Sequence, residues 1–253
     1  MVETDRATGK FNNVKTAISI VTIVKNDQEG LRRTIESVKC QEERSFQYVV
    51  VDGASCDGTL AVAHQQSCFI DVIDSRHDVG ISDAFNRGIA LSSGNYILML
   101  NAGDTFINAH ALSIINANAF PGKGDDIVCC GVINEVCGVI KPGPYSLPGE
   151  IPHQGMFVGR DVYQLMGGYS LKYGIRMDYE FVLRCKTTGI KFRFLDHLLC
   201  HYRAGGKSNL LNNRVQFYSE GVRAEIQHLN RPMFDSLLHL LYWKLKLKLR
   251  KNK

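Results

Sequence analysis

The sequence lacks several features that would place it in other classes of protein. It has no run of 18 or more apolar residues, which excludes a helix that spans a bilayer. No pair of its eight cysteines has CxxC spacing, and the polar start Met1–Thr16 carries no secretory leader. Free thiols without a leader are typical of a reducing compartment, so we expect a cytoplasmic protein without structural disulfides.

Two nucleotide-binding motifs are also missing. No GxGxxG follows the first predicted strand, and GxxxxGK[ST] occurs nowhere. The sequence therefore lacks the main evidence for a dinucleotide-binding enzyme or a P-loop NTPase. The 253 residues, with 45% apolar and 22% charged content, fit an ordinary globular protein of one large domain or two small ones.

The chain has no excess of basic charge outside its C-terminus. The chain has 30 Lys and Arg residues against 25 Asp and Glu, but six of the bases lie within residues 244–253, where no acid occurs. The near-neutral remainder argues against a nucleic-acid-binding face, so no nucleic acid is expected as a partner. The tail is the part predicted to contact something anionic.

Short runs rich in β-branched residues predict a sheet in the first half. These runs are Ile18–Val24, Tyr48–Val51 and Tyr96–Leu100, and Asp71–Asp74 fits a shorter strand. Apolar residues at helical spacing lie between them. Strand and helix in alternation predict an α/β fold with a doubly wound, mostly parallel sheet, whose ligand sites lie at the carboxyl ends of the strands.

The second half, from about residue 126, lacks this alternation. One more strand is predicted at Ile127–Val132, and glycine and proline crowd residues 138–152. The elements predicted after this loop are a helix at Met177–Thr187, strands at Phe192–Leu195 and Leu198–Tyr202, and a helix at Leu210–His228.

Acidic residues follow two of the predicted strands. Asp52 and Asp57 lie in a glycine-rich turn, where Asp57 or Thr59 can also cap the next helix. Asp104 lies in the turn after the strand that ends at Leu100. It either caps a following helix or ligates Mg²⁺ or Mn²⁺, ions that prefer oxygen ligands and take some of them from substrate phosphates.

A third polar cluster interrupts the amphipathic helix expected between these turns. It consists of Asp83, Asn86 and Arg87. Since Asp83 and Arg87 are four residues apart on a helix, they can form a surface ion pair, and the alternative is a role at a ligand site.

Taken together, these segments resemble glycosyltransferase family 2, the inverting nucleotide-sugar enzymes with the GT-A fold. The family's motifs V-D-G-x-S-x-D-G-T, D-x-G-I-x-D-A-x-N-x-G and L-N-x-[DG]-D match residues 51–59, 78–88 and 100–104. The later segments that resemble its acceptor-side elements are P-H-Q at 152–154, M-D-Y-E-F-V-L-R at 177–184 and G-G-K-S at 205–208. The resemblance covers roughly Ile18–Asn209 and is closest to the bacterial branch of exopolysaccharide and O-antigen assembly, which includes colanic-acid-type enzymes.

The resemblance implies a division of the chain into parts. It implies a flexible N-terminus, a GT-A domain with a nucleotide-sugar half and an irregular acceptor half, and C-terminal helices with a basic amphipathic tail. The respective ranges are 1–16, 17–125, 126–209 and 210–253.

The resemblance also implies a donor site in the first half. Asp52 would hydrogen-bond the nucleotide base, implied to be uracil, and Asp83 and Arg87 would face the ribose, the diphosphate or the sugar. The chain that follows the first strand would line the same pocket. The full set implied for donor binding is Val24, Lys25, Asp27, Asp52, Asp83, Arg87 and Asn101.

The metal and the general base are implied in the same way. Asp104 would be the last acid of a DxD-like motif and would hold Mn²⁺ or Mg²⁺ against the diphosphate. Asp178 would be the general base. Glu180 is a rival base, although on a helix that begins near Met177 it points about 200° away from Asp178.

Three further polar residues have open roles. His153 either contacts the acceptor or only satisfies its loop, and Gln154 beside it belongs to the same acceptor-side element. His201, at a predicted strand end, is either an extra metal ligand or a structural histidine.

The sequence departs from the family pattern at three positions. Lys25 stands where relatives usually carry an aromatic residue, Gly103 replaces the middle acid of a fuller DxD, and Met177 replaces a Glu before the base. These departures keep open a catalytically silent scaffold that binds nucleotide sugars. A sugar nucleotidyltransferase is a further alternative, but its glycine-rich phosphate loop is absent.

The segment from Phe234 to Arg250 interleaves leucines with basic residues. As a helix it would place Leu238, Leu241 and Leu245 on one side, and Trp243 would suit a lipid headgroup boundary. The alternatives are a terminal helix packed on the domain or, because leucine and base alternate, a strand. Membrane contact would suit a UDP-sugar transferase whose acceptor is a polyprenyl-diphosphate-linked glycan, peripheral on the cytoplasmic face of the inner membrane.

Overall fold

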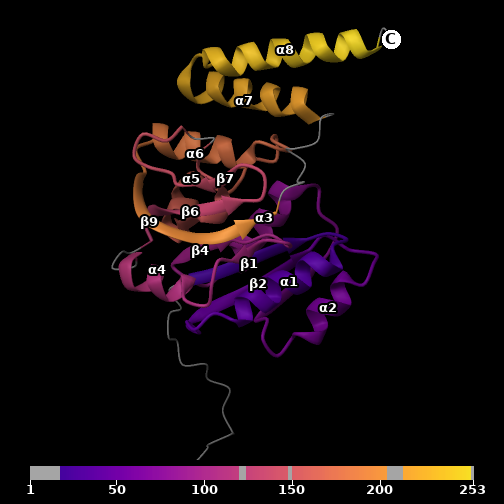
Figure 1. The fold of residues 1–253 in the computed structure, drawn as a ribbon, viewed down its shortest axis with the longest axis vertical. Helices are drawn as coiled ribbons and strands as arrows, with labels where there is room; N and C mark the ends of the chain where they lie inside the picture. Colours follow the sequence, from indigo (N-terminus) through magenta and orange to yellow (C-terminus); the bar gives the residue numbers. More distant parts are fainter. Residues whose placement is uncertain (1–17, 120–123, 148–149, 204–212, 252–253) are drawn as a thin grey trace, which may run out of the picture.

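A mixed nine-stranded sheet organises the residues that the computed structural model describes, which are 18–119, 124–147, 150–203 and 213–251 (Figure 1). Along the sheet the strands follow the order β3-β2-β1-β4-β8-β6-β9-β5, and β7 pairs with β6 at one side. The N-terminal residues 1–16 and the G-G-K-S segment at 205–208 lie outside the described residues.

The parallel part of the sheet is built from the first half of the chain. Its strands are β1 (Ile18–Val24), β2 (Phe46–Asp52), β3 (Val72–Ser75) and β4 (Tyr96–Met99). The helices that connect them are α1 (Gln28–Lys39), α2 (Thr59–Gln65) and α3 (Ile81–Leu91). Parallel strands buried on both faces are continuously apolar, which is why the sequence predicted these strands to within about two residues.

Five further strands extend the same sheet: β6 and β9 run parallel to each other, and β5, β7 and β8 run antiparallel to their neighbours. They are β5 (Thr105–Phe106), β6 (Asp126–Asn134), β7 (Gly138–Ile140), β8 (Met156–Gly159) and β9 (Lys191–Tyr202). β8 lies antiparallel between β4 and β6, and so joins the two halves. The two strands predicted between 192 and 202 form the single strand β9, because a register shift opposite Gly131 accommodates the polar residues between them.

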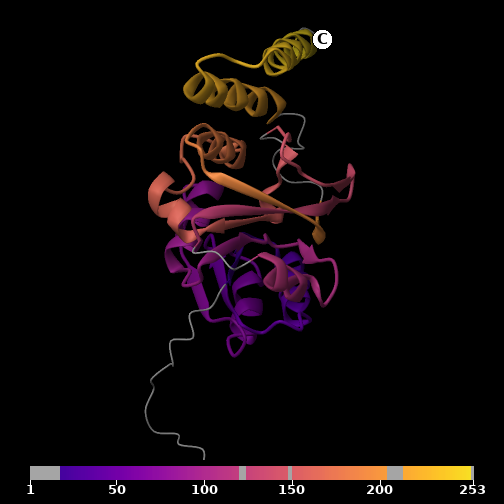
Figure 2. The same cartoon turned by 90° about the vertical axis from the view of Figure 1, so that its left-hand side faces the viewer.

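The remaining helices cover both faces of the sheet, and the C-terminal ones gather at one end of the molecule. They are α4 (Ala111–Ala119), a short 3₁₀ turn at His153–Gly155, α5 (Arg160–Met166), α6 (Met177–Thr187), α7 (Arg214–Leu229) and α8 (Phe234–Lys251). Two perpendicular views show α6, α7 and α8 stacked one above the other, with α8 outermost (Figures 1 and 2). The tail is thus a helix and not a strand. No helix of the described residues is long and apolar enough to cross a membrane.

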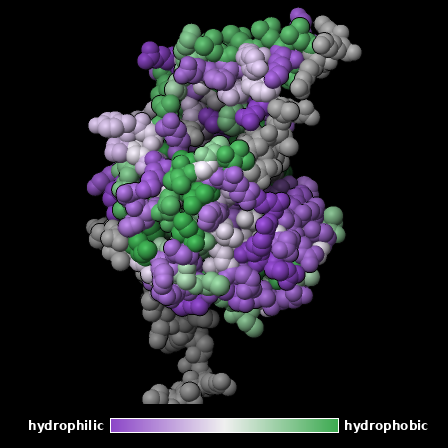
Figure 3. Space-filling model, in the orientation of Figure 1, coloured by the Kyte–Doolittle hydropathy of each residue, from purple (hydrophilic) through white to green (hydrophobic). Residues whose placement is uncertain are grey.

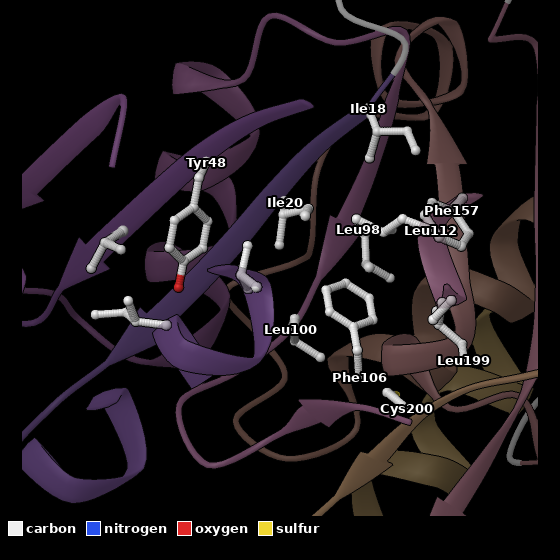
Figure 4. Close-up of a cluster of buried hydrophobic side chains, with 14 of the residues drawn as sticks. Ile18, Ile20, Tyr48, Leu98, Leu100, Phe106, Leu112, Phe157, Leu199 and Cys200 are labelled. Atoms are coloured by element: carbon white, nitrogen blue, oxygen red, sulfur yellow. The ribbon is translucent and has the colours of Figure 1, made fainter. Parts of the chain in front are cut away.

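Apolar side chains pack on both faces of the sheet. One cluster lies between the strands and α1, α2 and α4, and the other lies under α3, α5 and α6. Neighbouring residues of β1 serve opposite faces, Ile20 in the first cluster and Val21 in the second, as strand geometry requires. Figure 4 shows the first cluster, in which Tyr48, Leu98 and Phe157 lie among its members. The sheet is therefore the central layer, which confirms the predicted α/β fold.

The carboxyl ends of β1, β2 and β4 meet at one edge of the sheet. Val24 pairs with Asp52, and Val21 pairs with Met99 one strand further along. The turns that follow these strands carry the acidic motifs, so the topology brings the predicted donor and metal residues to the same edge.

Substitution of Gly159, at the end of β8, tests how closely this strand packs against the backbone at residues 124–126. A Cβ there would lie 2.0 Å from the carbonyl oxygen of Gly124 and 2.8 Å from that of Asp126. We expect Gly159→Ala to lower the free energy of unfolding by about 3 kcal/mol, because backbone atoms must shift to accept the methyl group. Urea denaturation measures the effect. Gly143→Ala, where nothing lies within 4 Å, is the matched control. Equal stability of the two variants would contradict the close packing.

Candidate active site

The loops after β1 and β2 are hydrogen-bonded to each other. Gly53 N donates to Val24 O at 2.9 Å, Asn26 N donates to Ser55 Oγ at 2.8 Å, and Cys56 N donates to Asn26 Oδ1 at 2.8 Å. Asn26 has a φ of 51°, a left-handed conformation that asparagine tolerates. The predicted donor residues of the first loop therefore lie directly beside the turn that carries Asp52.

Lys25 and Asp78 flank the backbone of Gly53. A Cβ at Gly53 would lie 2.1 Å from Asp78 Oδ2 and 3.2 Å from Lys25 Cδ. Lys25 itself is exposed. The pocket wall therefore carries a flexible base where relatives usually carry an aromatic ring.

Asp52 is fully buried, and its carboxylate is occupied by local donors. It accepts hydrogen bonds from Ser55 N, from Ser55 Oγ at 2.5 Å and from Ser75 Oγ at 2.6 Å. These bonds hold the turn after β2 against the end of β3. The Asp52 carboxylate therefore lies beneath this turn and does not reach the surface.

Arg87 is buried and pairs with Asp74 rather than with Asp83. Its Nη2 lies 2.6 Å from Asp74 Oδ2, and its guanidinium also donates to the carbonyl oxygens of Arg76 and Asp52. The expected ion pair with Asp83 is replaced because Asp74, at the end of β3, lies on the buried side of α3. Asp83 instead accepts from Val79 N at 3.2 Å, beside the start of its helix.

Asp27 and Arg203 close the first loop over the metal motif. Asp27 caps α1 by accepting from Gly30 N at 2.9 Å, and its Oδ2 lies 3.2 Å from Arg203 Nη1. The Arg203 side chain passes over Gly103, where a Cβ would lie 3.2 Å from Arg203 Cδ. Gly103 has a φ of 96°, which favours glycine at the position where the family pattern can carry an acid.

Asp104 is nearly buried, with 4% of its surface exposed. Its Oδ1 accepts from Arg203 N, and its Oδ2 accepts from Asn101 N and from Gln154 Nε2 at 3.3 Å. Burial raises the pKa of Asp104 to about 6, against the lowering effect of these hydrogen bonds. Strand β5 follows directly, so Asp104 does not cap a helix.

The residues at this turn fit a divalent cation. Among the described residues Asn101 Oδ1 is buried without a hydrogen-bond partner, and burial desolvates the Asp104 carboxylate. Both are oxygen ligands of the kind that Mg²⁺ and Mn²⁺ prefer. Within the described ranges no three His, Cys, Asp or Glu side chains form a metal-binding group, so exposed His201 does not complete one with Asp104.

His153 connects this turn to the acceptor half. Its Nε2 lies 3.0 Å from Asn101 Nδ2, and its Nδ1 lies 3.4 Å from Asp178 Oδ2. In the neutral ring whose Nε2 accepts from the amide nitrogen, and equally in the protonated ring, Nδ1 carries a proton that points to the carboxylate. The ring also packs edge-on against Phe85 of α3, at 5.3 Å between centroids. His153 therefore contacts both halves of the site.

Asp178, in the first turn of α6, is held ionised. Burial alone would raise its pKa, but the hydrogen bond and charge of His153 and the charge of Arg176 outweigh burial and hold the pKa below its usual range. The side chain keeps 29% of its surface exposed. It is therefore an accessible carboxylate that can accept a proton at neutral pH.

Glu180 lies on the opposite side of α6. Only 1% of its surface is exposed, and its carboxylate pairs with Arg184 at 2.9 Å and with His228 Nε2 at 2.9 Å. As its helical angle predicted, it points away from Asp178. The structure thus brings together Asp104, Asn101, His153, Gln154 and Asp178, and it separates Glu180 from them.

Two residues of this arrangement, Arg203 and Thr34, lie outside the sequence motifs. Arg203 lies 99 residues after Asp104, and only the pairing of β9 with β5 brings them together. Thr34 of α1 holds the turn that carries Asp104: its hydroxyl lies 2.8 Å from Asp104 O, to which it can donate, and accepts from Gly103 N at 2.9 Å. Nothing at Thr34 beyond its place on the buried face of a helix could have indicated this role.

The family model for glycosyl transferase family 2 matches residues 19–198. The chain belongs to this family. An uncharacterized glycosyltransferase of Mycobacterium tuberculosis is 34% identical over 178 residues, which cover 66% of this chain and 68% of that protein. A PGL/p-HBAD biosynthesis glycosyltransferase of Mycobacterium bovis is 29% identical over 203 residues, which cover 76% of this chain and 79% of that protein.

Solved structures share the fold of this family 2 glycosyltransferase at low identity. Residues 1–349 of Staphylococcus aureus TarS in complex with UDP-GlcNAc match with a TM-score of 0.65 and 14% identity, over 89% of this chain and 71% of that one. The mannosyltransferase PcManGT of Pyrobaculum calidifontis, in complex with GDP-Man and Mn²⁺, matches with a TM-score of 0.66 and 13% identity. The match covers 90% of this chain and 68% of that one. The predicted GT-A fold is confirmed, and the family favours a nucleotide-sugar glycosyltransferase over a nucleotidyltransferase.

His153→Ala tests the ionisation of Asp178. Without the imidazole, burial would raise the pKa of Asp178, because the partner that opposes burial is gone. We expect the acidic limb of the kcat/KM profile for nucleotide-sugar turnover to move to higher pH, with a smaller loss at pH 8 than at pH 5. His64→Ala, at an exposed histidine of α2, is the control. An unchanged acidic limb would contradict the contact.

Proposed function

We propose that this chain is an inverting, metal-dependent glycosyltransferase that moves a hexose or N-acetylhexosamine from a UDP-sugar to a lipid-linked glycan. In this proposal Asp178 is the general base and Asp104 holds Mn²⁺ or Mg²⁺. The supporting observation is the contact of His153 with both Asp178 and Asn101. It places an ionised, accessible carboxylate of the acceptor half next to the turn that fits a cation.

The chemistry of sugar transfer suits these groups. Displacing a nucleoside diphosphate from an anomeric carbon builds negative charge on the leaving group, and a bound divalent cation would neutralise that charge. Asp178 would take the proton from the attacking hydroxyl, a contribution of about 10²–10⁴-fold for general base catalysis. The Nδ1–H of His153 orients the carboxylate for this transfer. One direct displacement inverts the anomeric centre, so an α-linked donor gives a β-linkage.

The donor site would be formed by the loops after β1, β2 and β3. Lys25 is exposed and can reach a phosphate or a base, and the Arg203 guanidinium, 3.2 Å from Asp27 Oδ2, would lie near the diphosphate. Arg87 and Asp52 would hold the walls of this pocket. TarS binds UDP-GlcNAc and PcManGT binds GDP-Man, so the base is a question for experiment, and we favour UDP.

Two apolar faces of α8 support a membrane-bound acceptor. Leu240 is buried on the side toward α7, and Trp243 is half-buried on that same side of the helix, away from the headgroup position expected for it. Opposite them lies an outer stripe of exposed apolar side chains, green along the outer edge of Figure 3. Its members are Phe234, Leu238, Leu241, Leu245 and Leu249, each at least 47% exposed.

The charges beside this outer stripe favour an anionic bilayer over a second copy of the chain. Lys244 and Lys248 flank the stripe, and no acid follows Asp235 on the helix. A second copy would bring like charges together, whereas anionic lipid adds about 1 kcal/mol for each basic residue near its surface. We therefore propose a peripheral enzyme on the cytoplasmic face of the inner membrane.

A bilayer-bound enzyme suits a polyprenyl-diphosphate-linked glycan as acceptor, as in O-antigen or exopolysaccharide assembly. The relatives described above are mycobacterial, so this branch of surface-polysaccharide synthesis is part of the proposal. His153 and Gln154 would line the acceptor side of the site.

Thermal unfolding with nucleotides tests the donor and the metal together. We expect UDP with Mn²⁺ to raise the Tm, and GDP, CMP, dTDP or added chelator to give little change, because a ligand at 100 times its Kd stabilises the folded state by about 2.7 kcal/mol. Asp104→Asn should lose the response, and Asp161→Asn, at an exposed carboxylate of α5, should keep it. A response to GDP alone would change the donor class, and no response at all would contradict the donor site.

A catalytically silent scaffold is the second candidate, which Gly103 and Lys25 favour because they replace residues typical of the family. Asp178→Asn separates it from an enzyme. We expect this variant to bind UDP as the wild type does but to lose about 10²–10⁴-fold in transfer to lipid extract. Undiminished transfer would refute the assignment of the base, and no transfer by the wild type to any native lipid would favour the scaffold.

Co-sedimentation with vesicles tests the outer stripe of α8. We expect binding to phosphatidylglycerol vesicles and a loss of about tenfold or more in Leu241→Glu/Leu245→Glu, because burying one leucine side chain contributes about 1.5–3 kcal/mol. Ile226→Glu, at an exposed isoleucine of α7, is the matched control. If the double variant keeps vesicle binding, the stripe is not the contact. A loss of self-association without vesicles would indicate a second copy instead.

A further inference from the structure

Helix α6, which carries Asp178, begins without a side-chain cap of its own. Its N-cap residue is Arg176, whose side chain accepts no hydrogen bond from the first turn. The first backbone N–H groups of a helix have no partner within the helix and must be satisfied from elsewhere. Asp178 lies only two residues after the N-cap, so whatever fixes the chain there also fixes the carboxylate.

A carboxylate from another helix accepts hydrogen bonds from the backbone that leads into α6. Glu220 of α7 accepts from Gly174 N at 3.0 Å through Oε1, and from Ile175 N and Arg176 N at 2.9 Å each through Oε2. Gln216 Nε2, one turn earlier on α7, donates to Oε1 at 2.8 Å. Three successive backbone donors thus converge on one side chain.

Glu220 binds these donors as an anion. It is 3% exposed, and although burial raises its pKa, the backbone hydrogen bonds from Arg176 and its neighbours outweigh burial and hold the pKa below its usual range. Hydrogen bonds to an ionised acceptor are roughly twice as strong as neutral ones. The approach is also close, since a Cβ at Gly174 would lie 3.0 Å from Gln216 Nε2.

The contacts of Asp178 itself are weaker. Its Oδ2 lies 3.4 Å from His153 Nδ1, a long distance for a hydrogen bond, and within the described part of the chain its Oδ1 accepts only from the adjacent Tyr179 N. The backbone at 174–176 therefore sets where the carboxylate stands. We propose that Glu220 is a positioning residue that holds Asp178 in register with His153 by fixing the backbone that leads into α6. This inference rests on the proposed role of Asp178 as the general base.

A second buried glutamate of α7 provides a matched comparison. Glu225 has no exposed surface and accepts from Tyr179 Oη at 2.6 Å, from Met233 N at 2.8 Å and from Ser236 Oγ at 2.6 Å. Its bonds hold α8 and the side chain of Tyr179, but they do not reach the backbone at 174–176. Glu225 thus shares the burial, helix and chemistry of Glu220 without its place before Asp178.

The experiment compares Glu220→Gln with Glu225→Gln in the full chain. UDP-GlcNAc hydrolysis, in which water replaces the acceptor hydroxyl, gives kcat and KM, and amide hydrogen exchange reports on residues 174–176. We expect Glu220→Gln to lower kcat by about 10- to 100-fold with an unchanged KM, since a displacement of about 1 Å has such an effect. Exchange at 174–176 should rise in this variant alone. Glu225→Gln should lower the Tm and keep kcat.

The outcomes separate this inference from the function on which it rests. A wild-type kcat in Glu220→Gln, or an equal loss in both variants, would overturn the positioning role. If Asp178→Asn keeps the wild-type hydrolysis rate, the base itself is wrong, and the positioning role is overturned with it. Should Glu220→Gln fail to fold, Gln216→Ala removes one hydrogen bond to Glu220 and is expected to lower kcat more weakly with the same unchanged KM. An unaltered kcat there would also overturn the role.

Discussion

The imidazole of His153 is the contact on which the organisation of the site depends. Its two ring nitrogens face Asn101, on the turn that carries Asp104, and Asp178, on a helix of the acceptor half. Nδ1 carries a proton that points to Asp178 both in the neutral ring whose Nε2 accepts from Asn101 and in the protonated ring. His153 thus links the turn that carries Asp104 to the candidate base.

The buried carboxylates fall into two groups, those that hold the fold together and one at the candidate site. Asp52, Glu180, Glu220 and Glu225 are almost fully buried and are satisfied by several donors each, so they hold loops and helices. Asp104 is also buried, and burial raises its pKa to about 6. A desolvated carboxylate beside the Asn101 amide oxygen fits the proposed divalent cation, which prefers oxygen ligands.

The pair of helices α7 and α8 contacts α6 on its inner side and presents an exposed apolar surface on its outer side. Its inner side is bonded through glutamates to the helix that carries Asp178, and its outer side presents an apolar stripe with basic flanks. A contact at the outer side and the geometry of the base are therefore separated by only two layers of helix (Figure 2). The proposed lipid contact and the proposed base thus lie in one stack of helices.

The sequence by itself determined the α/β class, the strands β1, β2 and β4, the helix α6 and the family. Apolar runs and three ordered motifs are local features, and β1 and α6 were predicted with their observed ends. Only the tertiary structure decided that Arg87 pairs with Asp74, that Asp52 is buried beneath its turn, and that Trp243 lies on the inner side of α8. The physical reason is that a side chain's partner depends on which strands and helices pack beside it, and such neighbours, like Glu220 before Asp178, lie tens of residues away along the chain.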